Sequence, residues 1–189
     1  GQIAGRAGRY LNDGSFGITG DCKEISPEEV ELLENHKFEE IRTLFWRNSN
    51  LNFNNPISLI KSLEEKPEVE WLRKIHECED EKALKYFLKD QRILNKEFHK
   101  KTLMLLWECC QIPDFVKKTY GYHFEVIGNV FKFLNSKKGL ISEDYMRLQL
   151  MKLDKLDGNV DSLSNRIANV RTWSYVSNKN NWVENQSYW

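Results

Sequence analysis

A group of arginine, glutamine and glycine residues at the start of the chain has side chains suited to binding phosphate groups and orienting a water. Arg6 and Arg9 are three residues apart, and Gln2 stands four residues before Arg6, so all three side chains fall on one side of a helical turn. A guanidinium group stays charged and matches two phosphate oxygens at once, whereas an amide orients an attacking water. Gly5 and Gly8 leave room for another surface to approach closely. These residues indicate a phosphate ligand and phosphoryl-transfer chemistry.

The segment from Gln2 to Arg9 resembles motif VI of the superfamily-two helicases, Q-x-x-G-R-x-G-R, and every specified position is filled. With about 5% usage for each specified residue, a chance match somewhere in a chain of this length has odds on the order of one in ten thousand. The competing interpretation is an exposed basic helix end in which the glycines serve as caps. The sequence does not contain the Gly-Lys-Ser or Gly-Lys-Thr of a Walker-type phosphate loop.

The resemblance extends beyond the motif. Residues 2–9 and 12–20 look like the end of the second RecA-like domain in the mitochondrial degradosome RNA helicase and its alphaproteobacterial relatives. Residues 106–115, 156–168 and 171–175 look like the bacterial branch especially. Because these segments follow in order, the resemblance to this helicase family covers nearly all of the chain.

The resemblance implies an ATP-dependent helicase that acts on RNA, or alternatively on DNA, with ATP and Mg²⁺ held between two RecA-like domains. By position, Arg9 is then the arginine finger on the γ-phosphate, Arg6 a second phosphate contact and Gln2 the residue that positions the hydrolytic water. Gly5 and Gly8 are permissive positions of the same ATP site. The phosphate loop, the acidic magnesium-binding motif and the first RecA-like domain are absent from these 189 residues, so the fragment alone is not expected to hydrolyse ATP.

The resemblance also implies partners and a cellular location. Expected partners are single-stranded RNA or DNA and a ribonuclease or other degradosome component in RNA degradation, in a bacterial cytoplasm and without a membrane. The chain has no initiator Met and ends in an aromatic dipeptide, so we expect the natural polypeptide to continue at both ends.

The composition is that of a folded globular protein. Lys plus Arg number 28 and Asp plus Glu number 28, which excludes a polybasic tail and a strongly acidic solvating chain. Hydrophobic residues make up 40% and aromatic residues 12%, enough for a buried core. No apolar run approaches the ~20 residues of a bilayer span, and the chain does not start like a signal peptide. The scattered histidines favour no zinc site, and we expect reduced thiols at Cys22, Cys78, Cys109 and Cys110.

Residue patterns predict a mainly α fold in two parts. Residues 1–36 are predicted to be the C-terminal end of the second RecA-like domain, with helix–strand–helix order, and residues 37–189 to be a helical accessory domain. In the first part, residues 16–19 are predicted as a strand, and Ser26 with Glu29 as a capping box that starts a helix. Residues 36–55 and 66–79 are predicted as loop or short strand.

Six helices are predicted in the second part from caps and apolar spacing. They start near Asn55, Asp80, Phe98, Tyr122, Ser142 and Asp161. Their predicted inner faces are Ile57, Ile60 and Leu63; Ala83, Leu84, Phe87 and Leu88; Leu103, Leu106, Trp107 and Cys110; Phe124, Ile127, Phe131 and Leu134; and, in the last helix, Leu163, Ile167 and Val170.

Candidate contacts to a nucleic-acid strand are the basic and aromatic residues of three short segments, because phosphates need cations and unstacked bases need aromatic platforms. They are Trp46, Arg47, Lys117, Lys118, Tyr120, Arg171 and Trp173. The competing interpretation places Trp173 in the core and the two lysines in a solvated loop.

Two other functions remain open at this point. One is a stand-alone helical protein-interaction module that retains a vestigial helicase motif. The other is a nucleic-acid-binding domain without coupling to ATP.

Overall fold

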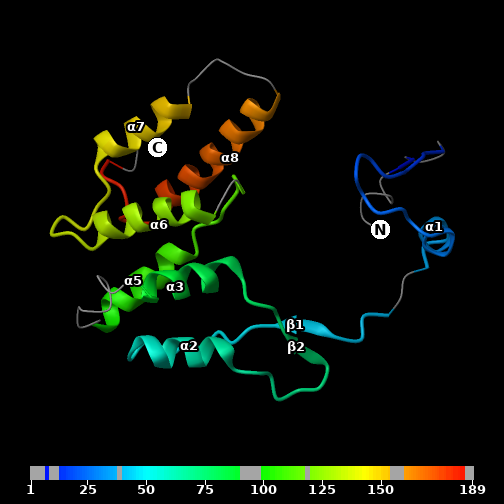
Figure 1. The fold of residues 1–189 in the computed structure, drawn as a ribbon, viewed down its shortest axis with the longest axis horizontal. Coiled ribbons are helices and arrows are strands. Elements are labelled where there is room, and N and C mark those ends of the chain that lie inside the picture. Colours follow the sequence, from blue (N-terminus) through cyan, green and yellow to red (C-terminus); the bar gives the residue numbers. More distant parts are fainter. Residues whose placement is uncertain are drawn as a thin grey trace. The chain divides into compact units, whose positions relative to one another are not determined.

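The computed structural model describes residues 7–8, 13–37, 40–89, 99–117, 120–153 and 160–185. In these ranges the chain is mainly helical, as predicted, with two short strands (Figure 1). The elements are α1 (Pro27–Glu34), β1 (Leu44–Trp46), α2 (Pro56–Glu64), β2 (Leu72–Lys74), α3 (Glu79–Lys89), α5 (Lys100–Cys110), α6 (Tyr120–Leu134), α7 (Glu143–Leu153) and α8 (Val160–Ser177). No helix within these ranges is both long and apolar enough to cross a membrane.

The chain divides into two compact units, Gly1–Leu44 and Phe45–Trp189, whereas the sequence placed a boundary after residue 36. In the first unit, the predicted capping box is confirmed at the start of α1. The Ser26 hydroxyl accepts from the Glu29 N–H at 3.2 Å, and the Glu29 carboxylate accepts from the Ser26 N–H at 2.9 Å. None of the residues of α1 is buried.

The predicted strand over residues 16–19 is wrong. Residues 13–19 have no regular secondary structure. A strand exists only where a neighbour completes its hydrogen-bond ladder, and the described part of this unit supplies no such neighbour to this segment. Most of the helix predicted over the motif, residues 1–9, lies outside the described ranges.

The second unit begins with a β1–α2–β2 arrangement. The two strands pair, and the Ile75 N–H extends the pairing by donating to the Trp46 carbonyl at 2.9 Å. Both strands fall in the segments predicted as loop or short strand. As predicted, Asn55 caps α2, accepting from the Ser58 N–H at 2.8 Å. The buried Asn48 amide fixes the loop after β1 by donating to the Ser62 carbonyl at 2.9 Å.

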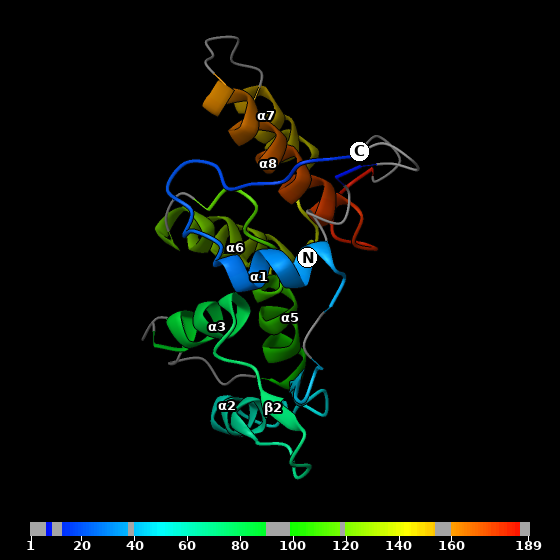
Figure 2. The same cartoon turned by 90° about the vertical axis from the view of Figure 1, so that its right-hand side faces the viewer.

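The core of this unit is built from α3, α5 and α6. Helix α5 packs against α3 and against α6 (Figures 1 and 2). The predicted inner faces of α3 and α5 are confirmed, because every one of their residues is buried. On α6 the predicted face is also buried except for the half-buried Phe124. The buried residues are Ala83, Leu84, Phe87, Leu88, Leu103, Leu106, Trp107, Cys110, Ile127, Phe131 and Leu134.

Helices α7 and α8 form a hairpin that packs on this core at one end (Figure 2). The predicted Ser142 cap of α7 is confirmed by a 3.3 Å bond from the Tyr145 N–H. After α8 the chain turns back, and Ile141 pairs with Val183 in an isolated bridge. The Ile141 N–H donates to the Trp182 carbonyl at 2.8 Å. This return fastens the C-terminal half of α8 to the start of α7.

One predicted inner face is wrong in part and another is wrong throughout. On α2, Leu63 is buried and Ile60 is half-buried, as predicted, but Ile57 is 81% exposed and Leu59 is buried instead. On α8, the predicted stripe of Leu163, Ile167 and Val170 is exposed. Only the C-terminal half of α8 reaches the core, so the buried side chains are those of Thr172, Trp173, Val176 and Ser177.

Candidate functional site

The motif at the start of the chain is described only in part. Gln2, Gly5, Arg6 and Arg9 lie outside the described residues, whereas Gly8 is described and has a φ of 76°. This left-handed conformation disfavours any residue with a Cβ.

Gly14 lies against the same turn. A methyl group on Gly14 would overlap the backbone of Ala7 and Gly8, so both glycines serve a close backbone approach. The requirement for glycine inside the motif therefore has a local structural cause.

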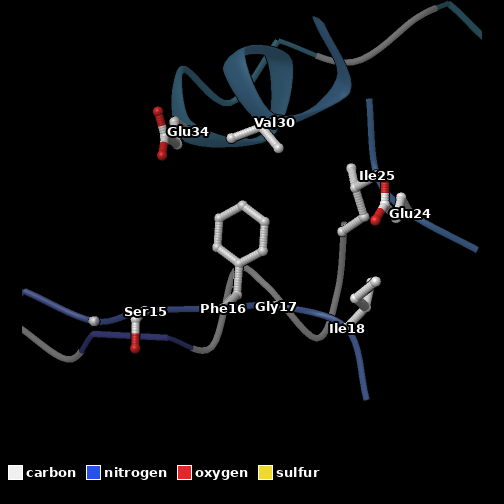
Figure 3. Close-up of a pocket in the computed structure, with 9 residues that line it drawn as sticks. Ser15, Phe16, Gly17, Ile18, Glu24, Ile25, Val30 and Glu34 are labelled. Carbon is white, nitrogen blue, oxygen red and sulfur yellow. The ribbon is translucent and has the colours of Figure 1, made fainter. Parts of the chain in front are cut away.

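A pocket of about 500 Å³ lies in the same unit (Figure 3). The ring of Phe16 points toward Val30 of α1, and Ile25 closes one side of the pocket (Figure 3). The carboxylates of Glu24 and Glu34 also line it. No described residue that lines this pocket is cationic, so its lining does not suit a phosphate.

Arg47 is engaged in the fold of the second unit. Its guanidinium forms two hydrogen bonds with the Asp80 carboxylate, at 2.7 and 3.0 Å, and lies 5.1 Å from the ring centroid of Trp107. The pKa of Arg47 is raised overall. Burial is the largest single effect and lowers this pKa, but the hydrogen bond and the charge of Asp80 together outweigh it. Arg47 thus ties the end of β1 to α3 and α5, which is a structural role.

Trp173 is also structural. It is 3% exposed and packs edge-to-face on Tyr145, with ring centroids 5.9 Å apart. No face of the Trp173 ring is open to a nucleic-acid base.

Lys117 and Arg171 lie beside the same loop. Lys117 is exposed, has a φ of 49°, and is held by a 2.9 Å bond from its N–H to the Asp114 carboxylate. The Arg171 guanidinium lies 4.1 Å from the ring centroid of Phe115. Lys118 lies outside the described residues. Of the predicted strand contacts, the structure thus brings Lys117 and Arg171 to one loop, while Arg47 and Trp173 lie in the packing of the unit.

Tyr120, one of the predicted strand contacts, belongs to a group of aromatic rings whose other members were not predicted. Tyr86 of α3 and Tyr120 of α6 are 54% and 56% exposed, and Phe124 of α6 lies next to both. Tyr86, Phe124 and Tyr120 are called the aromatic face below. The spacing Lys82–Tyr86 on one helix and Tyr120–Phe124 on another, each four residues apart, is the sequence pattern that could have pointed to it.

The four cysteine thiols differ in their exposure to solvent. All four cysteines are free, and Cys109 and Cys110 are buried. Burial raises the pKa of Cys109 to about 12 and that of Cys110 well above its usual value, so neither forms a thiolate at neutral pH.

We therefore expect a thiol reagent to modify Cys22 fastest and Cys78, which is half-buried, more slowly. Cys109 and Cys110 should react only after unfolding. Mass spectrometry of the labelled native and denatured chain checks this order, and Cys22→Ser should remove the fast phase alone. Labelling of Cys109 at the rate of Cys22 in the native chain would contradict the described packing of α5.

His123 of α6 gives the second unit a dependence on pH. It is 4% exposed, and burial lowers its pKa below the ordinary 6.5, against smaller opposing effects from Asp114 and Glu79. The unfolded chain therefore binds a proton below about pH 6.5 that the folded chain does not. The stability contributed by neutral His123 is complete above that pH and is lost as the pH falls toward the folded-state pKa.

We expect the urea midpoint of unfolding to be lower at about pH 5.5 than at about pH 7.5, and His123→Gln to flatten this difference. An unchanged pH dependence in His123→Gln would assign the effect to other groups.

The described residues hold no group of three His, Cys, Asp or Glu side chains placed to bind a metal ion. No protein-family model, curated protein or solved structure matches the chain.

Proposed function

We propose that this chain is the C-terminal part of a superfamily-two ATP-dependent helicase that acts on RNA, to which it contributes motif VI and a helical accessory domain. The observation that carries the proposal is the complete Q-x-x-G-R-x-G-R pattern over residues 2–9. The left-handed Gly8 supports it, because a residue with a side chain is disfavoured at that motif position.

In this proposal the residues of the motif divide the work of phosphoryl transfer. Arg9 stabilises the charge that develops on the γ-phosphate in the transition state, Arg6 holds a second phosphate oxygen, and Gln2 positions the attacking water. ATP and Mg²⁺ are held mainly by domains that precede the motif in the complete polypeptide. No acidic cluster suited to Mg²⁺ occurs in the part of this chain that the structure describes.

The second unit supplies the strand contacts in this proposal. Lys117 and Arg171 are suitable because the first is exposed and both lie at one loop. Arg47 is already paired with Asp80, and Trp173 is buried, so neither is retained as a strand contact.

The test is ATP hydrolysis by the complete polypeptide, with and without single-stranded RNA. We expect RNA to stimulate hydrolysis, and Arg6→Ala and Gln2→Ala each to reduce kcat by about 10²-fold or more, since each removes a contact to the reacting groups. Hydrolysis that is absent in the wild-type polypeptide, or unchanged in both variants, would contradict the proposal.

The second candidate function is the helical interaction module. Five exposed apolar residues on the two helices of the α7–α8 hairpin favour it, because exposed apolar surface can mark a protein contact. They are Leu148, Met151, Leu163, Ile167 and Val170. This candidate predicts protein binding that is unaffected by Arg6→Ala and Arg9→Ala, and no ATP hydrolysis in the complete polypeptide.

A further inference from the structure

We propose that the aromatic face of α3 and α6 is a stacking platform for the bases of a single-stranded nucleic acid. The inference deepens the proposed function and rests on it, because it names the surface through which the helical unit would hold the strand. It replaces the predicted platform Trp173, whose ring is buried.

The three rings form a row. The ring centroids of Tyr86 and Phe124 are 4.6 Å apart, with ring planes 30° from parallel. The centroids of Phe124 and Tyr120 are 6.0 Å apart, with planes 32° from parallel. Both tyrosines at the ends of the row are more than half exposed, so each offers ring surface to a base.

The row is held by the core beneath it. The buried ring of Phe87 packs edge-on against Tyr86 at 5.3 Å and lies 6.2 Å from Phe124. On α6, Gly128 leaves room for the Phe87 ring, which lies 3.4 Å from the position that a Cβ would occupy. Because helices rather than loops carry the rings, little conformational entropy is lost when a ligand stacks on them.

One cation lies at the row, and another precedes it closely in sequence. The Lys82 ammonium is 5.6 Å from the ring centroid of Tyr120, and exposed Lys117 is three residues before Tyr120 in the chain. Lys85 of α3, by contrast, is already bridged to Glu64, Glu77 and Glu81 at 3.3, 2.7 and 3.2 Å.

A single-stranded nucleic acid fits this chemistry better than the other ligands of aromatic surfaces. Its bases have flat faces for the two exposed end rings, Tyr86 and Tyr120, and its phosphates complement Lys82 and Lys117. A proline-rich peptide also docks on aromatic side chains, but it brings no anionic groups for the lysines. Duplex nucleic acid keeps its bases stacked on one another and so cannot use the row.

The test is fluorescence anisotropy with the whole chain, no ATP, and a labelled oligouridylate of about twelve nucleotides at about 50 mM salt. We expect binding to the single strand, weaker binding to a duplex of the same length, and no binding to a labelled proline-rich peptide. Tyr86→Ala and Tyr120→Ala should each weaken binding about fivefold or more.

Matched variants separate stacking from folding. Tyr120→Phe keeps the ring and should bind as the wild-type chain does, whereas Tyr120→Leu keeps apolar volume without an aromatic face and should bind like Tyr120→Ala. Trp71→Ala removes a ring that is 56% exposed elsewhere in the unit and should leave binding unchanged. Lys82→Gln should make the slope of log affinity against log salt less steep by about 0.7, because one phosphate contact is lost.

Three results would overturn the proposal: no binding of the oligouridylate at low salt, equal binding by Tyr120→Leu and the wild-type chain, or tighter binding of the peptide. None of them depends on ATP, so the platform and the arginine finger can fail separately. Ring-dependent binding in a polypeptide that does not hydrolyse ATP would instead support a binding domain without ATP coupling.

Discussion

Replacing Arg9 with alanine is expected to lower the turnover of RNA-stimulated ATP hydrolysis by the complete polypeptide by about 10³-fold or more. The guanidinium would act only where charge develops on the γ-phosphate in the transition state, in a site from which water is largely excluded. Its loss should therefore reduce kcat strongly and change the affinity for ATP little. Steady-state kinetics at saturating RNA separate the two quantities.

Two further variants make this result specific to the finger. Arg9→Lys keeps the positive charge but loses the planar, two-pronged geometry, so it should recover only part of the rate. Arg73→Ala removes an exposed arginine of β2, far from the motif in the chain, and should leave hydrolysis unchanged. A normal kcat in Arg9→Ala would defeat the assignment of Arg9.

The largest effect on stability is expected at Leu106, in the middle of the second unit. Its side chain is fully buried on α5, the helix that packs on both α3 and α6. Leu106→Ala removes buried apolar surface and leaves a cavity among three helices, which costs about 2–5 kcal/mol in the free energy of unfolding. Urea unfolding followed by far-UV circular dichroism measures the loss.

Met104→Ala on the same helix is the matched control, because Met104 is 40% exposed. It should cost less than about 1.5 kcal/mol, since most of its surface is already in water. Equal losses in the two variants would contradict the described face of α5.

Local chemistry made the helix starts predictable. Ser26, Asn55 and Ser142 each cap a helix by accepting a hydrogen bond from the backbone N–H three residues later, so a short stretch of sequence contains the whole interaction. The inner faces of α3 and α5 were predictable for a related reason: these helices are buried along most of one side.

Faces that depend on which helix lies opposite were not predictable. The stripe of Leu163 and Ile167 has the spacing of a core face, yet α8 passes the core only with its C-terminal half. The strand predicted over residues 16–19 failed because the pattern shows what a strand needs on its faces but not whether a neighbour pairs with its edge.

The candidate site divides along the same line. The resemblance of residues 2–9 to motif VI could be noticed from sequence because its specified positions lie within eight consecutive residues. Other features depend on tertiary structure. Arg47 pairs with Asp80, which is 33 positions away in the chain, and Tyr86 of α3 contacts Phe124 of α6. Their residue types favoured both Arg47 and Trp173 as strand contacts. Only the packing shows which cations are paired and which rings are buried, and which of them face solvent.

The most direct test of the central claim is to read the coding sequence immediately upstream of Gly1. A helicase in which Arg9 is the finger requires a phosphate-binding loop and a magnesium-binding acidic motif on the same polypeptide. We predict an open reading frame that continues upstream and encodes Gly-Lys-Ser or Gly-Lys-Thr followed by Asp-Glu, in frame with residues 2–9. A reading frame that begins near Gly1, or an upstream extension without those two motifs, would contradict the assignment as an ATP-dependent helicase.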